Sequence, residues 1–376
     1  MPDSQKNAIF IGATGQHVGK STTCLGIISG LQKLYSRVGF IKPIGQQHVT
    51  VPDGSAVDKD VVLFREHFNL DTDYKDMSPV IVPSGFTREY LDGKISSSSL
   101  QANIKRAFQN INTSNGFTVV EGTGHLGVGS IIGLDNARIA ALLGLEMIII
   151  VSGGLGSSFD ELALNLALCE KRGVKIRGVI LNRVIEDKRA MILEYYQKAL
   201  ATEGIPLIGA IPFNMFLSTP TIADFEVLLN APLLAGIEYR LRHFKGTRVV
   251  AGSLDSYHDE VLPSQLIITP ASREDVILAT LERHKSHIKT EGTNLKGGMI
   301  LTGRRPPHPD MIETIQRHNV PILYAAMTSY EVMRRITTFT AKTAKEDVRK
   351  VGRAIKLVEE HLDFDIIAGK PIDTIR

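Results

Sequence analysis

A glycine-containing turn between an apolar run and a helix-like segment carries the clearest chemical signal in the chain, in the stretch AIFIGATGQHVGKSTTCLGI. In such a turn the backbone amides and the positive end of the helix can bind phosphate groups. Lys20 adds a point charge for the phosphates, and Ser21 offers a hydroxyl to a magnesium ion. The stretch from Gly12 to Thr22 therefore predicts a phosphate-binding loop (P-loop) for a nucleoside triphosphate, with Mg-ATP as the expected ligand.

One position departs from the strict P-loop pattern, because Thr14 stands five residues before Gly19, where that pattern has glycine. We expect Gly12 and Gly15 to supply the flexibility instead. His17 could titrate near neutrality and touch a phosphate or a substrate, and the alternative is a plain polar loop residue. We expect the nucleotide to contact Thr14, Gly15, Gln16, His17, Val18, Gly19, Lys20, Ser21 and Thr22.

Charged residues at three other strand or helix ends could complete a nucleotide site. In FTVVEG, Glu121 ends an apolar strand at the edge where α/β sheets bind ligands, so it can reach magnesium directly or through water. In VGFIKP, Lys42 could neutralise a bound anion, and in VDKDVVLF, Asp58 and Asp60 could join the magnesium site. The alternatives are a solvated carboxylate for Glu121, a surface charge for Lys42 and a favourable helix-dipole interaction for the aspartates.

The composition is that of a globular protein, and we expect it to be cytoplasmic. The 43 basic and 40 acidic side chains give a formal net charge of +3 without a long basic run, which does not favour nucleic acid binding. The longest apolar stretch, MIIIV near Met147, is far shorter than the roughly 20 residues of a membrane helix, and the polar start MPDSQKN is not typical of a signal sequence. Cys24 and Cys169 offer no disulfide framework and are expected to be buried thiols.

Apolar runs alternate with helix-length amphipathic segments through the first 240 residues or so. This alternation predicts a doubly wound, mostly parallel α/β sheet. The strand-like runs are AIFIG, VGFIK, FTVVEG, MIIIVSG, GVILN and LIGAIP, and the helices are expected at 21–34, 59–68, 158–172 and 190–202.

A second, smaller α/β domain is expected after a boundary near Phe244. Past about Arg240 the sequence mixes charged residues, glycine and serine before the new strand-like runs LIIT and GGMILTG. Two domains agree with a length of 376 residues at roughly 100 to 200 residues per domain. The predicted domains are residues 1–243 and 244–376, with helices in the second at 273–284, 310–317, 329–336 and 345–361.

In these motifs the chain resembles the dethiobiotin synthetase family, a branch of the deviant P-loop ATPases that also includes cobyrinic acid and ParA-like proteins. The resemblance spans roughly Ala8 to Ile237. It rests on the order and spacing of VGKST, Lys42-Pro43, an Asp in the next helix, Glu121-Gly122, Leu155-Gly156, Leu181-Asn182-Arg183 and Gly209-Ala210-Ile211-Pro212.

The resemblance implies roles for individual residues. Lys20 and Ser21 would serve the phosphates and magnesium, while Asp60 and Glu121 would complete the metal site with Ser21. Asn182 would read the adenine edge, with Pro212 beside the base. Lys42 is similar to the lysine that holds a carbamate in the synthetases, so Lys20 and Lys42 are the expected catalytic residues. The substrate side departs from the family at His17, which replaces a common Glu, at Gln46, which replaces a small hydroxyl residue, and at His125, which replaces Gly.

A closer resemblance is to the amino-terminal half of long bacterial phosphotransacetylases, which join a dethiobiotin-synthetase-like domain to a DRTGG domain. It is carried by LPSQLIITPASREDVILATL, GGMILTGRRP and VPILYAAMTSYEVMRRI. Those enzymes continue into an acetyltransferase domain, so a sequence that stops at Arg376 is not expected to transfer acetyl groups itself. The resemblance implies an accessory DRTGG domain linked to regulation and assembly, and a homodimer. The turn from Thr302 to Arg305 could hold a small acidic metabolite, and its alternative is a solvated loop.

Two functions are consistent with these residues. The first is a regulatory protein in which Mg-ATP binding or hydrolysis is coupled to the DRTGG domain. The second is an ATP-dependent ligase that carboxylates, cyclises or amidates a small substrate, with Lys20, Lys42 and magnesium stabilising the transferred phosphoryl group. A glutamine-fed amidotransferase is disfavoured because no cysteine follows Cys169 to act as its nucleophile. A nucleotide-independent scaffold is disfavoured by the intact GKST motif.

Overall fold

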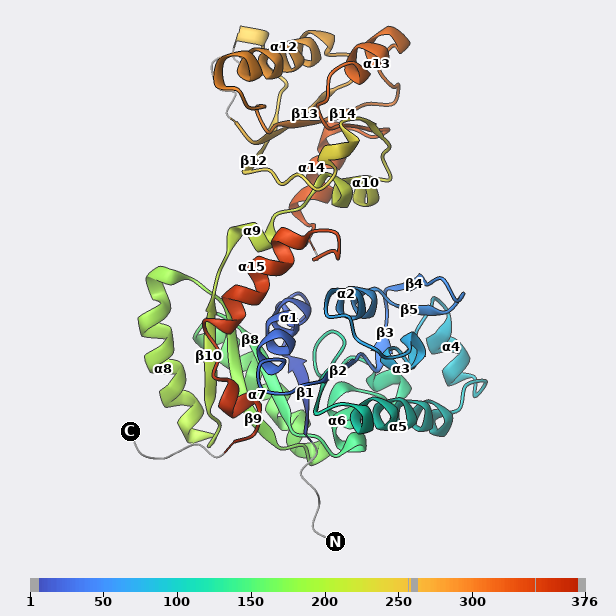
Figure 1. The fold of residues 1–376 in the computed structure, drawn as a ribbon, viewed down its shortest axis with the longest axis vertical. Helices are drawn as coiled ribbons and strands as arrows, with labels where there is room; N and C mark the ends of the chain where they lie inside the picture. Colours follow the sequence, from blue (N-terminus) through green and yellow to red (C-terminus); the bar gives the residue numbers. More distant parts are fainter. Residues whose placement is uncertain (1–6, 256, 258–262, 342, 371–376) are drawn as a thin grey trace. The chain divides into compact units, whose positions relative to one another are not determined.

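Six parallel strands form the central sheet of the first compact unit (Figure 1). The computed structural model describes residues 7–255, 257, 263–341 and 343–370. The strands are rich in β-branched residues and largely buried, as expected for a sheet between two helical layers. Their spatial order is β10 (Leu207–Pro212), β9 (Ile176–Val184), β8 (Met147–Ser152), β1 (Ala8–Ala13), β7 (Phe117–Glu121) and β2 (Val38–Ile41).

Helices cover both faces of this sheet, because successive strands are added on both sides of β1. The connection from β1 to β2 runs opposite to the later connections, and right-handed crossovers then put the intervening helices on opposite faces. The predicted doubly wound, mostly parallel fold is confirmed. One face carries α5 (Ser97–Ser114), α6 (Asn136–Leu143), α7 (Gly156–Arg172) and α8 (Arg189–Thr202), and the other carries α1 (Lys20–Leu31), α15 (Val348–Glu359) and α16 (Phe364–Ile367).

Short elements between β2 and α5 position the acidic residues near the P-loop. An antiparallel hairpin ends at Asp58, and the next residue begins a helix, so Asp58 and Asp60 are held at the end of that hairpin. These elements are β3 (Ile44–Gly45) paired with β6 (Val80–Ile81), β4 (His48–Thr50) paired with β5 (Ala56–Asp58), and α2 (Lys59–His67), α3 (Tyr74–Met77) and α4 (Phe86–Leu91); two 3₁₀ turns follow later in this unit, η1 (Ser130–Ile132) and η2 (Glu186–Lys188).

Helix α15 packs directly on α1, the helix that follows the P-loop (Figure 1). The approach requires glycine on α1, since a Cβ at Gly26 would lie 2.2 Å from Cβ of Val358 and one at Gly30 would lie 2.1 Å from the ring of Phe364. At the periphery, Ser29 Oγ donates a hydrogen bond of 2.7 Å to Glu359. The last described segment of the chain therefore belongs to the core of the first unit.

The second unit, Met215–Lys342, has a five-stranded sheet that is parallel except for its antiparallel edge strand β11. One helical pair packs on each face, which confirms a second, smaller α/β fold. The strand order is β11 (Leu233–Ala235), β15 (Ile322–Ala325), β14 (Gly298–Thr302), β13 (Gln265–Pro270) and β12 (Gly246–Val249); α12 (Glu274–Glu291) and α13 (Pro309–Gln316) cover one face, α10 (Ile222–Leu229) and α14 (Ser329–Thr337) the other, and α9 (Met215–Ser218) and η3 (Ile237–Tyr239) are short.

The compact units divide differently from the predicted domains 1–243 and 244–376. The first unit contains residues 1–214 and 343–376, and the second contains Met215–Lys342. The second begins before Phe244 because α10 buries Phe225 and Leu229 in its core and β11 pairs with β15. The helix predicted at 345–361 is observed as α15, but it packs on α1 and not in the second domain.

Cys24 and Cys169 are free and buried, as expected. Over the described part of the chain, the structure contains no helix with the length and apolar character that crossing a lipid bilayer requires.

Candidate nucleotide site

The predicted P-loop connects β1 to α1, and its glycine at the helix start is conformationally required. Gly19 precedes the helix with a φ of 100°, in the left-handed region that favours glycine. A Cβ at this position would also lie 2.3 Å from Nδ2 of Asn182. Because Gly19 has no side chain to cap α1, the first amides of the helix are available to an anion.

The remaining loop residues differ in exposure. Thr14 is buried and extends β1, since its amide donates to the carbonyl of Ile150 at 3.1 Å and its hydroxyl lies 3.4 Å from the carboxylate of Glu161. Gln16 and His17 are exposed, and His17 has a φ of 59°. Val18 is buried, whereas Gly15 and Thr22 are half-buried.

Lys20 is buried and its ammonium is directed by the loop after β7. The Nζ atom donates a hydrogen bond to the carbonyl of Gly124, which lies 104 residues further along the chain. Burial lowers the pKa of Lys20, and the nearby Glu121 carboxylate opposes that shift. An anion beside this ammonium would stabilise its charged form.

Ser21, Asp60 and Glu121 converge at the start of α1. The hydroxyl of Ser21 lies 2.7 Å from Oε1 of Glu121 and 3.1 Å from Oδ2 of Asp60. Glu121 is 1% exposed, so it is not a solvated strand-end carboxylate. Burial raises the pKa of Glu121, while Lys42 lowers it.

The oxygens of these three residues fit a magnesium ion. Oε2 of Glu121 is buried and has no hydrogen-bond partner, so a cation would satisfy it. Mg²⁺ is usually held by one or two carboxylates together with water and substrate phosphates. Within the described ranges no group of three or more His, Cys, Asp or Glu side chains could hold a metal by itself. The donor set therefore matches a metal shared with phosphates better than a closed metal centre.

Lys42 lies among three carboxylates. Its ammonium is 3.1 Å from Asp58, 3.7 Å from Glu121 and hydrogen-bonded to Asp60. Burial alone would lower the pKa of Lys42, but Asp60, Glu121 and Asp58 together raise it well above its usual value. Lys42 is 6% exposed, so it is not a surface charge.

The two aspartates have different roles in the structure. Asp58 caps α2 by accepting from the amide of Asp60 at 3.0 Å, and it also accepts from the amide of Gln46 at 3.2 Å. Asp60 instead directs its carboxylate to Ser21 and Lys42. A favourable interaction with the helix dipole therefore explains part of the placement of Asp58 at the start of α2. It does not explain why the Asp60 carboxylate is directed to Ser21 and Lys42.

Asn182 braces the P-loop from the end of β9. Its Nδ2 atom donates to the carbonyl of Val18 at 2.6 Å, and its Oδ1 atom accepts from the amide of Arg183 at 2.9 Å. Pro212 ends the neighbouring strand β10 and is paired with Val184. Both residues therefore lie on the carboxyl edge of the sheet, the edge to which β1 delivers the P-loop.

One residue that sequence reasoning missed shapes the loop that receives Lys20. Asn136, at the start of α6, donates to the carbonyls of Thr123 and His125 at 2.8 Å each and accepts from the amide of Thr123 at 3.0 Å. It thus fixes the backbone on both sides of Gly124. His125 accepts from the amide of Gly127 at 3.1 Å, inside the same loop. No spacing rule identifies Asn136, because its partners belong to an irregular segment.

Comparisons with known proteins match two family models to successive parts of the chain. A family model described as an AAA domain matches residues 7–221, and one described as a DRTGG domain matches residues 227–339. A phosphate acetyltransferase of Nitratidesulfovibrio vulgaris is 26% identical over 98% of this chain and 52% of its own length, and one of Pseudomonas aeruginosa is 25% identical over 96% and 51%. The chain thus spans about half the length of these curated relatives. A MinD cell division protein structure from Aquifex aeolicus is 17% identical, covers 56% of this chain and 84% of its own, and has a TM-score of 0.35.

Proposed function

Because the chain belongs to the AAA domain family over residues 7–221 and carries a DRTGG domain after it, we propose that it is a regulatory protein that responds to Mg-ATP. The observation that carries this proposal is the convergence of Ser21, Asp60 and Glu121 at the start of an uncapped helix. That arrangement supplies metal ligands and phosphate ligands in one place.

Each residue of the site has a distinct part in the proposed binding. The amides at the start of α1 and the ammonium of Lys20 would bind phosphate oxygens, and the lysine would exchange the carbonyl of Gly124 for a phosphate. The hydroxyl of Ser21 and the carboxylates of Asp60 and Glu121 would hold Mg²⁺, which neutralises charge on the phosphates. Asn182 and Pro212 would lie on the side of the base.

The course of the chain supports coupling between nucleotide and the DRTGG unit. The chain leaves the first unit after Asn214 and returns at Thr343, so the second unit is joined to the first at both of its ends. The returning segment forms α15, which packs on α1. A shift of α1 on nucleotide binding would therefore be transmitted to one of the two connections.

Hydrogen exchange of the whole chain with and without Mg-ATP tests the proposal. We expect Mg-ATP to slow exchange in the P-loop and in α1, and to change exchange in peptides from residues 215–341. Lys20→Ala should remove both effects, because the ammonium that pairs with phosphate is gone. Protection confined to the P-loop, with the DRTGG unit unchanged, would contradict a regulatory role and leave nucleotide binding intact.

Burial of Lys42 beside the metal ligands supports a second candidate, an ATP-dependent ligase. In this role Lys42 would stabilise a carbamate or a developing phosphoryl charge, as the resemblance to dethiobiotin synthetases implies. We expect a ligase to release ADP faster when a diamine and bicarbonate are added. If ADP release stays flat across diamines and carboxylic acids, this candidate is refuted and the regulatory one is not.

We also propose a homodimer that binds neither nucleic acid nor membranes. The proposal rests on the family resemblance and on the nearly balanced charge of +3. Light scattering of the purified chain should give twice the mass of 41.2 kDa, and the monomer mass would contradict it.

A further inference from the structure

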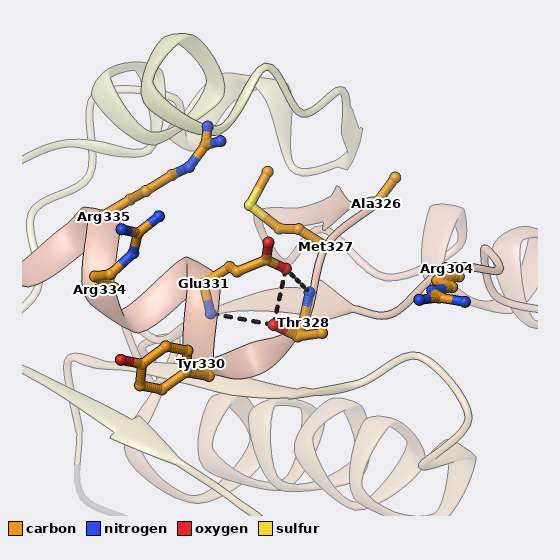
Figure 2. Close-up of a pocket in the computed structure, with 8 residues that line it drawn as sticks. All are labelled: Arg304, Ala326, Met327, Thr328, Tyr330, Glu331, Arg334 and Arg335. Atoms are coloured by element: carbon orange, nitrogen blue, oxygen red, sulfur yellow. Dashed lines mark hydrogen bonds between the residues drawn. The ribbon is translucent and has the colours of Figure 1, made fainter.

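A cavity opens in the second unit at the carboxyl ends of its parallel strands, far along the chain from the P-loop residues. Its volume is about 810 Å³. The loop after β14 contributes Arg304, and helix α14 contributes Arg334 and Arg335 (Figure 2). Ligands of α/β sheets bind at this edge, so the position of the cavity is that of a binding site.

The walls of the cavity are held in place by hydrogen bonds within the unit. The amide of Gly303 donates to the carbonyl of Met327 at 2.7 Å, and the hydroxyl of Tyr324 donates to the carbonyl of Gly303 at 2.8 Å. The hydroxyls of Thr302 and Ser329 are 2.7 Å apart. These contacts tie the loop that carries Arg304 to the start of the helix that carries the other two arginines, so the cavity is preformed.

The charge of the lining is positive. The lining contains three guanidinium groups and one carboxylate, that of Glu331. That carboxylate accepts from the amide and the hydroxyl of Thr328, at 2.9 and 2.8 Å, and so completes a capping box at the start of α14 (Figure 2). These hydrogen bonds lower the pKa of Glu331. Since one carboxylate stands against three guanidinium groups, Glu331 neutralises the arginines only in part.

Two of the arginines have no fixed partner. Over the described residues, the side chains of Arg304 and Arg334 make no hydrogen bond or ion pair, and the side chain of Arg335 makes one long hydrogen bond of 3.4 Å to the carbonyl of Leu228. Guanidinium groups bind phosphate through two parallel hydrogen bonds. Tyr330 lines the same cavity and is 75% exposed, so its ring offers a flat face to a ligand.

We propose that this cavity binds a small phosphorylated metabolite carrying a base or another flat group. Arg304 and Arg334 bind the phosphates from two sides, and Tyr330 stacks on the flat part. The residues that line the cavity all belong to the second unit, and the proposal does not depend on nucleotide binding at the P-loop. It gives the DRTGG unit a ligand of its own.

Titration calorimetry of the full chain carrying Lys20→Ala tests the proposal, with pyrophosphate, ADP and citrate as probes. We expect ADP and pyrophosphate to bind, ADP more tightly, and citrate to bind at least tenfold more weakly. Arg304→Gln or Arg334→Gln should weaken ADP binding on the order of tenfold, because each removes a charge-assisted pair. Arg305→Gln, the adjacent exposed arginine that does not line the cavity, is the matched control and should leave binding unchanged.

Hydrogen exchange locates the bound probe in the same protein. We expect ADP to slow exchange in residues 303–305 and 326–335. Three results would overturn the proposal: no heat with either phosphate probe, equal loss of binding in Arg305→Gln, or protection confined to the P-loop. Tyr330→Leu should reduce the preference for ADP over pyrophosphate, and an unchanged preference would refute the stacking role.

Discussion

Replacing Lys42 by methionine should destabilise the first unit strongly, because it leaves three buried carboxylates without their cation. Asp58 and Glu121 lie 3.1 and 3.7 Å from the ammonium, and Asp60 is hydrogen-bonded to it. Removing one partner of a buried ion pair costs about 3–5 kcal/mol. Domains are stable by only about 5–15 kcal/mol, so the variant should lose a large fraction of its stability.

The loss should depend on pH in a defined direction. In the wild type, the pKa of Lys42 is raised, so Lys42 makes a constant contribution to the free energy of unfolding at every pH below the usual lysine pKa. That contribution falls only as the pH rises above the usual lysine pKa. In Lys42→Met, burial without the opposing ammonium raises the pKa of Glu121 further. A carboxyl group with a raised pKa destabilises the fold increasingly as pH rises above its unfolded pKa. The free energy of unfolding that Lys42→Met loses relative to the wild type should therefore be larger at pH 8 than at pH 5.

The loss of stability is measured by urea unfolding of the full chain, with hydrogen-exchange mass spectrometry used to monitor peptides of the first unit. Lys198→Met is the matched control, since Lys198 is 63% exposed and its pair with Glu194 is worth at most about 1 kcal/mol. Adding Asp60→Asn to Lys42→Met should recover part of the loss, because one of the three like charges in the buried cluster is removed. If Lys42→Met behaves like the control at both pH values, the reasoning about this cluster is refuted.

Three further perturbations test the site and its support. Glu121→Gln should raise the Mg²⁺ concentration needed for ATP binding about tenfold or more, measured by magnesium titration at fixed ATP, since one carboxylate oxygen is replaced by a weaker ligand; an unchanged requirement would exclude it as a ligand. Gly19→Ala should abolish ATP binding in filter assays, because its Cβ would clash with Asn182 at a strained φ, and normal affinity would contradict that geometry. Gly26→Val should push α15 off α1, costing about 1–3 kcal/mol, and unchanged exchange in residues 348–359 would contradict the close packing on Val358.

Much of the fold could be predicted because its strands are continuous apolar runs between amphipathic helices. The spacing of GKST after such a run also indicated where α1 begins. Helix α5 was not among the expected helices, although Leu100, Ile104 and Ile111 follow helical periodicity. Its many serine, asparagine and glutamine residues resemble a loop in composition and obscure that pattern.

The parts that could not be predicted depend on contacts between distant segments. The family resemblance assigned Lys42, Asp60 and Glu121 to one nucleotide site, but no spacing in the sequence predicts that Lys42 is buried and paired with these carboxylates. Asn136 supports a loop through backbone carbonyls, which leave no trace in residue spacing. The return of α15 to α1 depends on Gly26, and a glycine within a helix pattern has several common causes.

Calorimetric titration of the purified chain with ATP, in the presence and absence of Mg²⁺, tests the central claim most directly. We expect saturable binding that requires Mg²⁺ and is lost in Lys20→Ala, because the ammonium, the helix amides and the metal ligands act on one triphosphate. The absence of heat with both Mg-ATP and Mg-GTP, at concentrations far above those in cells, would contradict a nucleotide site at the start of α1.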